Sequence, residues 1–212
     1  MPNHLRVLPI IAMLVATFPS TQAGVMTYSD EASFLDAIDP FYLESFDGLT
    51  TNPDPTELTL GPSNGFSYRV SAVKGLFVVA PGGDVALSTN TYSDDLNVTM
   101  DQGVVTAFGG WFFPTDASGN SVAGNVGLSF DLIGGTAWST TVAKGDFFGL
   151  TSSLAITDVT VTAPGSVYPT LDDLYVGSAS KTSAAPAPAP ATAALLALGL
   201  LVVGMRRAAN RG

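Results

Sequence analysis

The chain has 212 residues, of which 46% are hydrophobic and only 12% are charged, and its formal net charge at pH 7 is −10. It contains no cysteine and a single histidine, His4. A domain that excludes this N-terminal histidine cannot use disulfides, cysteine or histidine catalysis, or a zinc site of the usual His/Cys type. All the acidic residues but only four basic ones lie within residues 24–185, and such a surface is expected to repel nucleic acid.

The N-terminal segment has the features of a secretory signal peptide. Arg6 precedes an apolar core at residues 7–18, and Thr21 and Ala23 are small residues at the expected cleavage positions. We therefore predict a signal peptide at residues 1–23, cut after Ala23, and export of the chain that follows. The alternative is an uncleaved first membrane helix, which the short apolar run and Pro9 disfavour.

Residues 24–180 are predicted to form one all-β domain. Ser29 is expected to cap a short N-terminal helix at residues 30–38. After it, short segments rich in Val, Thr and aromatic residues alternate with Gly- and Pro-containing turns, a pattern that favours a jelly-roll-like β-sandwich. The predicted strands are residues 41–46, 66–70, 75–80, 84–88, 95–100, 104–113, 121–132, 136–142, 147–151, 156–162 and 171–176.

Four acidic residues are candidates for a metal site. Glu44 lies in an early predicted strand and Asp47 directly follows that strand, while Asp172 and Asp173 lie in the last one. In jelly rolls these two strands often lie side by side. Since calcium prefers six to eight oxygen ligands, the four carboxylates form a plausible partial set for a structural Ca²⁺. In the alternative interpretation, one of Asp172 and Asp173 faces solvent while the other caps a turn.

Two tryptophans are candidates for ligand stacking. If exposed on a sheet face, Trp111 and Trp138 would stack on sugar rings. If buried, they are core residues, as the apolar neighbours Phe108 and Phe113 suggest. No spacing among the acidic residues selects a carboxylate pair for glycoside hydrolysis, so the sequence predicts no enzymatic activity.

The C-terminal segment has three parts. Residues 181–190, rich in Ala, Pro, Ser and Thr, are predicted to form an extended linker. The apolar residues 191–205 would make a helix roughly 22 Å long, against a hydrocarbon core of roughly 30 Å. Arg206 and Arg207 follow, and positive charge is retained on the cytoplasmic side. We predict a single, marginal membrane helix within a tail at residues 191–212; a buried core helix is the alternative.

This tail resembles the PEP-CTERM sorting signal of exported bacterial proteins. The resemblance rests on Pro188, Ala189 and Pro190, the apolar segment that follows them, and Arg206 with Arg207. Ala189 stands where the family usually has glutamate, so this is a Pro-Ala-Pro variant. In that family an exosortase, a membrane-embedded cysteine protease-transpeptidase, recognises and cleaves the tail in exopolysaccharide-producing Gram-negative bacteria. The resemblance implies an exosortase-type partner, transit through the inner membrane, and a final location at the cell surface or outside the cell.

Together these features predict an exported, non-enzymatic surface or extracellular-matrix protein. Its expected role is that of a structural or adhesive component of an exopolysaccharide matrix. The alternative is a carbohydrate-binding module with a structural calcium, and a third interpretation is a secreted hydrolase. Apart from calcium no cofactor is expected, and the expected partners are the processing enzyme, the inner membrane and polysaccharide.

Overall fold

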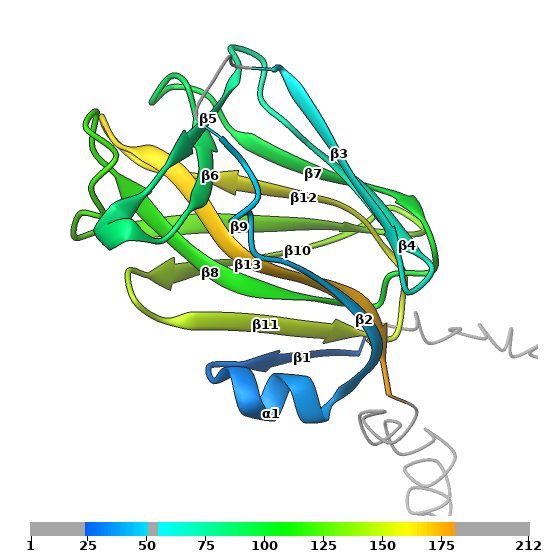
Figure 1. Ribbon diagram of the computed structural model, residues 1–212. Helices are drawn as coiled ribbons and strands as arrows, with labels where there is room; N and C mark the ends of the chain where they lie inside the picture. The colour runs from blue at the N-terminus through cyan, green and yellow to red at the C-terminus, as the bar shows by residue number, and fades with distance from the viewer. Residues whose placement is uncertain (1–23, 51–54, 181–212) are drawn as a thin grey trace, which may run out of the picture.

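Two antiparallel β-sheets packed face to face form the domain in the computed structural model, which describes residues 24–50 and 55–180 (Figure 1). This arrangement confirms the β-sandwich predicted from the alternating strands and turns. The jelly-roll character of its connections stays a prediction.

Several predicted segments lie outside the described residues. They are the signal peptide at residues 1–23, the linker at 181–190, and the tail at 191–212, with Pro188, Ala189, Pro190, Arg206 and Arg207. Within residues 24–50 and 55–180, none of the helices has the length and apolar character needed to cross a membrane.

The first sheet has seven strands in the order β1-β11-β8-β13-β6-β5, with β2 also paired to β13. Their bounds are β1 (Val25–Tyr28), β2 (Ile38–Glu44), β5 (Leu76–Val79), β6 (Ala86–Thr89), β8 (Ala107–Thr115), β11 (Phe147–Ser152) and β13 (Tyr168–Ala179). A short helix, α1 (Glu31–Asp36), lies against this sheet, and a 3₁₀ turn, η1 (Pro81–Gly83), connects β5 to β6.

The second sheet has six strands in the order β10-β9-β12-β7-β4-β3. Their bounds are β3 (Glu57–Ser63), β4 (Phe66–Ser71), β7 (Leu96–Gln102), β9 (Asn125–Leu132), β10 (Thr136–Ala143) and β12 (Ile156–Thr162). Strands β1 and β3 were not predicted. The strand expected at residues 121–132 begins only at Asn125, and the last strand is longer at both ends than expected.

The main core lies between the two sheets. Alternate residues of β4, Phe66, Tyr68 and Val70, are buried there, as the period of two along a strand requires. The inner face of the first sheet contributes Phe108 and Phe112 from β8. The opposite face of β8 is therefore the outer face of the first sheet.

A smaller apolar cluster covers part of that outer face. Phe34 of α1 packs there with Phe147 and Tyr175. Its ring occupies space left by two glycines: a Cβ on Gly109 or Gly149 would come within 2.7 or 2.4 Å of ring carbons of Phe34. The helix is thus held by the fit of one aromatic side chain into a glycine-lined depression.

The ends of α1 differ from the prediction. The N-cap is Asp30 and not Ser29, because the Asp30 Oδ1 accepts a hydrogen bond of 2.9 Å from the Ser33 N–H. The helix ends at Asp36, whereas Ile38 was expected to belong to it. Ile38 instead begins β2 and pairs with Ala179 of β13, so tertiary pairing overrides the local helical pattern.

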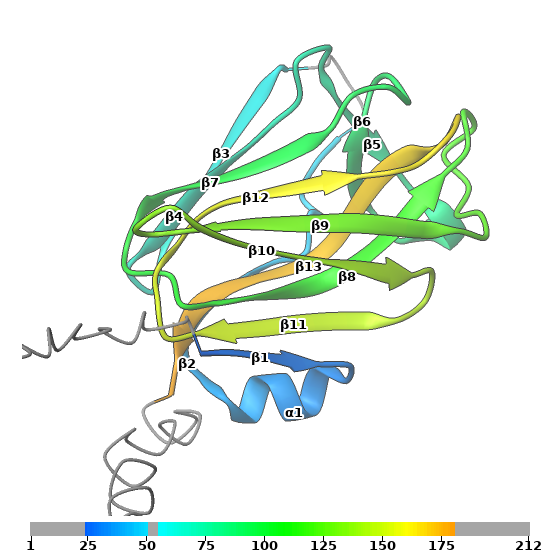
Figure 2. The same ribbon diagram turned by 180° about the vertical axis from the view of Figure 1, so that it is seen from behind.

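Strand β13 runs from one end of the sandwich to the other. Its 12 residues span about 36 Å at roughly 3.3 Å per residue. The start of β1 and the end of β13 lie at the same end of the domain in both views (Figures 1 and 2). The start of β13, η1, and the connections β8–β9 and β10–β11 lie at the opposite end.

Candidate functional site

Three of the predicted site residues line one pocket on the outer face of the first sheet. Trp111 of β8 and Asp172 of β13 are direct cross-strand partners, and Asp173 follows. The pocket, here called the Trp111 pocket, has a volume of about 480 Å³. Its walls come from four other segments of the chain: Glu31 of α1, Pro81 and Asp84 around η1, Ser121 of the β8–β9 connection, and Lys144 of the β10–β11 turn.

An irregularity in β13 brings both carboxyl groups to this pocket. In a regular strand, successive side chains point to opposite faces of the sheet. Here the register between β13 and β8 shifts between Asp172 and Tyr175, and the other partner of β13 changes from β6 to β2. Asp173 has a φ of 45°, which is uncommon outside glycine. A β-bulge of this kind re-aims side chains and is frequent beside functional sites.

Gly110 of β8 makes room for the bulge. A Cβ at this position would lie 3.0 Å from the carbonyl oxygen of Asp172 and 3.1 Å from that of Asp173. Most real Cβ atoms do not approach other atoms so closely, and the contact would be with backbone. The glycine directly before Trp111 therefore allows the backbone of β13 to bend toward β8.

Burial and neighbouring negative charge perturb the two carboxyl groups. Asp172 is only 8% exposed, and its burial raises its pKa to about 7, with smaller contributions from the charges of Asp173, Asp84 and Asp47. The Asp173 N–H donates a hydrogen bond of 2.9 Å to Asp172 Oδ1, which opposes this rise. The pKa of Asp173 is also raised, mainly by burial and then by the charges of Asp84 and Glu31. Near pH 7 Asp172 is therefore protonated in about half of the molecules, so the pocket can offer a carboxyl donor as well as hydrogen-bond acceptors.

The other side chains around the pocket have defined partners. Trp111 is half-buried and packs edge-to-face on Phe147, with ring centroids 5.7 Å apart. The Glu31 Oε1 accepts a hydrogen bond from the Tyr175 hydroxyl. The Lys144 ammonium donates to the carbonyl oxygen of Ser121 at 3.0 Å. The Lys144 contact joins two walls of the pocket, and the other two contacts tie Trp111 and Glu31 to the apolar cluster around Phe34.

The remaining members of the predicted calcium set do not line the pocket. Glu44 accepts hydrogen bonds from the Tyr42 hydroxyl and the Phe46 N–H. Asp47 is exposed and near enough for its charge to raise the pKa values of Asp172 and Asp173. In the described part of the chain, no three Asp, Glu or His side chains form a group that can hold a metal ion. The calcium site stays a prediction.

Trp138 lies elsewhere. It belongs to β10, and its ring stacks on Phe148 with centroids 6.0 Å apart and lies 5.5 Å from that of Phe130. These partners belong to the core between the sheets, against which Trp138 packs while partly buried. The structure therefore brings Trp111, Asp172 and Asp173 together and places Trp138 apart from them.

Sequence reasoning missed the walls of the pocket. Glu31, Asp84, Ser121 and Lys144 are far apart in the chain and show no common spacing. The one usable signal was the glycine pair of the turn at residues 81–84, which marked a tight connection without showing what it faces.

No family model matches the chain, and a search of curated proteins finds no match. Among solved structures, the chain is similar to a family 11 carbohydrate-binding module from Clostridium thermocellum in complex with a beta-1,3-1,4-mixed-linked tetrasaccharide. The TM-score is 0.33 and the identity 8%, over 66% of this chain and 96% of that one. At this TM-score the likeness does not bear on what this chain binds.

Proposed function

We propose that the protein is an exported surface or matrix component whose β-sandwich binds a neutral polysaccharide in the Trp111 pocket. The observation that supports this most is the half-buried indole of Trp111 beside the two consecutive carboxyl groups of the β13 bulge. The excess of acidic residues in the domain disfavours nucleic acid as a ligand.

The chemistry of the pocket suits a sugar residue. One face of a pyranose ring presents C–H groups, which pack on an aromatic ring, while its hydroxyls need hydrogen-bond partners. Asp173 and Glu31 are acceptors, the protonated form of Asp172 is a donor, and the Lys144 ammonium is a further donor. Anionic polymers would be repelled by the excess of acidic residues, which favours a neutral glycan.

The position of the pocket suits display from a membrane. The connections that wall it lie at the end of the sandwich opposite to the start of β1 and the end of β13 (Figures 1 and 2). A domain held through a C-terminal tail would therefore present the pocket outward. We propose that residues 191–212 direct this delivery and that an exosortase-type enzyme processes them.

Fractionation of cells tests the delivery. With an exosortase present, we expect a shortened species outside the inner membrane. A full-length protein that stays in the membrane under these conditions would contradict processing and leave simple anchoring.

Glycan binding by the full-length protein, purified in detergent, tests the pocket. Neutral glycans are screened on an array, and affinities are then measured by titration. Trp111→Ala should weaken binding at least about tenfold, a loss of roughly 1.4 kcal/mol, while Trp138→Phe, which keeps an aromatic ring in the core, should not change it. Unchanged affinity in a folded Trp111→Ala protein, or no binding of any neutral glycan by the unmodified protein, would refute sugar binding in this pocket.

The same samples test for hydrolysis. A pKa near 7 on Asp172 is also what the general acid of a glycoside hydrolase requires. The binding role predicts that bound glycans release no new reducing ends over prolonged incubation. Release that is lost in Asp172→Asn would instead support the secreted hydrolase.

A further inference from the structure

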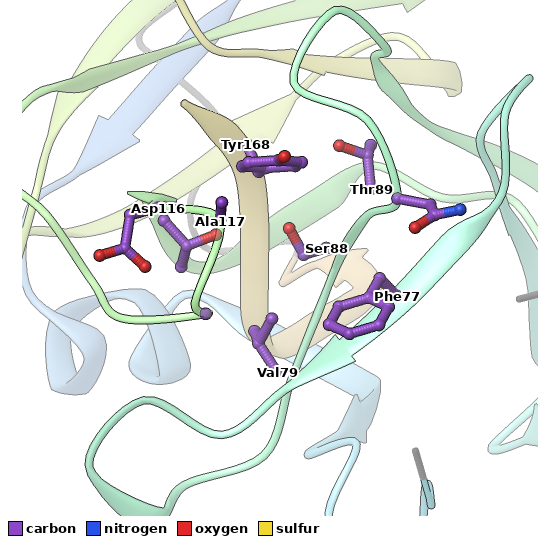
Figure 3. Close-up of a pocket in the computed structure, with 10 residues that line it drawn as sticks. Phe77, Val79, Ser88, Thr89, Asp116, Ala117 and Tyr168 are labelled. Carbon is purple, nitrogen blue, oxygen red and sulfur yellow. The ribbon is translucent and has the colours of Figure 1, made fainter. Parts of the chain in front are cut away.

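A second hollow lies on the same outer face of the first sheet. It measures about 140 Å³ and is here called the Tyr168 pocket. Its aromatic residues are Tyr168 at the start of β13 and Phe77 of β5 (Figure 3). None of the residues predicted from the sequence as a candidate site lines it.

Strand register places the two pockets next to each other. Leu171 faces the core between the sheets, so Thr170 and Asp172 point to the outer face. Thr170 pairs with Ser88 of β6, which lines the Tyr168 pocket, and Asp172 pairs with Trp111. These two rows are two residues apart along β13, which corresponds to roughly 7 Å.

The β8–β9 connection lies between the pockets. Gly119 lines the Tyr168 pocket, and Ser121 lines the Trp111 pocket. The carboxylate of Asp116 holds this connection in shape by accepting hydrogen bonds from the Ser118 N–H at 2.8 Å and from the Asn120 N–H at 3.0 Å. A wall that is already ordered loses little conformational entropy when a ligand binds.

Two aromatic rings flank the hollow. In Figure 3, Tyr168 and Phe77 lie on opposite sides, with the Ser88 side chain between them. Phe77 is 40% exposed, which is unusual for such a large apolar side chain on a strand. Tyr92 packs edge-to-face on Tyr168 and supports that ring from outside the pocket. The rings offer apolar surface to a ligand with a flat C–H face.

The hydroxyl groups in and beneath the floor of the pocket all donate hydrogen bonds within the domain. The Thr170 hydroxyl donates to Ser88 Oγ at 2.9 Å. Because a hydroxyl has one proton, Thr115 is the donor in the 2.9 Å hydrogen bond between the Thr115 and Thr170 hydroxyls. Ser88 in turn donates to the carbonyl oxygen of Pro169, and Thr89 donates to that of Thr91. These hydroxyls are at most 1% exposed and have no proton left to donate, so the floor does not match an acceptor-only group such as carboxylate or phosphate.

Asn90 supplies the complementary group. Its exposed side-chain amide lines the pocket and makes no hydrogen bond within the described part of the chain. An amide both donates and accepts, as does a sugar hydroxyl. At roughly 30 Å³ per water the hollow holds about five waters, which is room for one small ring and not for several.

We propose that the Tyr168 pocket binds one neutral sugar residue and forms a second subsite beside the Trp111 pocket. The protein then binds a glycan chain through two residues of that chain and not a single sugar. The claim that the two pockets act together on one glycan chain rests on the proposed function. The claim that the Tyr168 pocket binds a sugar is supported by its own aromatic rings and floor residues. Two sites on one chain raise affinity through effective concentration.

The test measures affinity against ligand length. The probes are oligosaccharides of two to eight units cut from neutral glucans, mannans and galactans, titrated into the full-length protein in detergent. We expect affinity to rise with length by at least about tenfold, and we expect this gain to disappear in Phe77→Ala and in Asn90→Ala. Ile133→Ala is the control, because Ile133 is exposed and lies next to the second sheet.

The outcomes separate the two proposals. If affinity still rises fully with oligosaccharide length in Phe77→Ala and Asn90→Ala while Trp111→Ala abolishes binding, the second subsite is refuted and the proposed function stands. If Phe77→Ala and Asn90→Ala abolish binding while Trp111→Ala does not affect it, the Tyr168 pocket is the sugar site and the proposed role of the Trp111 pocket is refuted. Binding of polygalacturonate, an anionic probe, with loss in Asn90→Ala would refute the neutral-ligand assignment. Failure of all probes to bind refutes both proposals.

Discussion

Replacement of Asp172 by asparagine should remove a large pH dependence from the stability of the domain. Asp172 is 8% exposed, and burial raises its pKa from 3.8 to about 7. The folded state therefore holds a proton on this group at pH values where the unfolded chain has lost it. By linkage, the stability that this proton confers is complete below pH 3.8 and is lost progressively as the pH rises to about 7.

The size of the effect follows from the shift. A difference of about 3 pKa units corresponds to roughly 4 kcal/mol, of which about 3 kcal/mol is lost between pH 4.5 and pH 8. Asparagine keeps an oxygen acceptor for the Asp173 N–H and carries no charge at either pH. At pH 8 the variant should therefore be more stable than the unmodified protein, because it buries no charge. The gain is at most about 3 kcal/mol, since an amide oxygen accepts a weaker hydrogen bond from the Asp173 N–H than a carboxylate does.

Urea unfolding at pH 4.5 and pH 8, followed by tryptophan fluorescence, measures this difference. Other acidic groups also titrate in this range. The change in the free energy of unfolding between the two pH values is therefore compared between the variant and the unmodified protein. Asp131→Asn, at an exposed position on β9, serves as the control and should follow the unmodified protein. If Asp172→Asn shows the same pH dependence as the unmodified protein, the assignment of a buried, protonated carboxyl group is wrong.

Three further measurements test other features of the structure. The hydroxyl of Tyr68 is buried and has no hydrogen-bond partner among the described residues, so Tyr68→Phe should raise the free energy of unfolding by about 1 kcal/mol, and a loss of that size would contradict the structure around it. In Gly149→Ala the new Cβ would lie 2.4 Å from the Phe34 ring, which should lower the free energy of unfolding by about 1–3 kcal/mol, whereas Gly48→Ala, with open space around it, should change it little. If Glu44, Asp47, Asp172 and Asp173 bind calcium as the sequence predicts, a chelator lowers the melting temperature, and an unchanged value eliminates the site.

The strands were largely predictable, because their signal is local. In β4, buried Phe66, Tyr68 and Val70 alternate with more exposed Ser67 and Arg69, and this pattern can be read along the chain. In the strands that were missed this pattern is short or interrupted. Strand β1 has only four residues, and β3 contains Gly61 and Pro62, so both depend on hydrogen bonds to β11 and β4 more than on their own composition.

The site was predictable only in part. Trp111, Asp172 and Asp173 were selected by residue type, and the structure brings them together. Their grouping depends on the register between β8 and β13 and on the bulge at Asp173, neither of which follows from spacing along the chain. The same reasoning by residue type also selected Trp138, which the fold places against the core between the sheets.

The sequence by itself determined the β-sandwich class, the absence of disulfides, and the absence of cysteine and of any histidine beyond His4, since these follow from composition and from a period of two residues. It also predicts a signal peptide and a sorting tail, which lie outside the described residues. Only the tertiary structure decided which acidic and aromatic side chains share a pocket. Residues as distant in the chain as Glu31 and Asp173 come to line one pocket when strands pair and loops fold over them. The free energy of that pairing is spread over the whole domain and does not reside in any local motif.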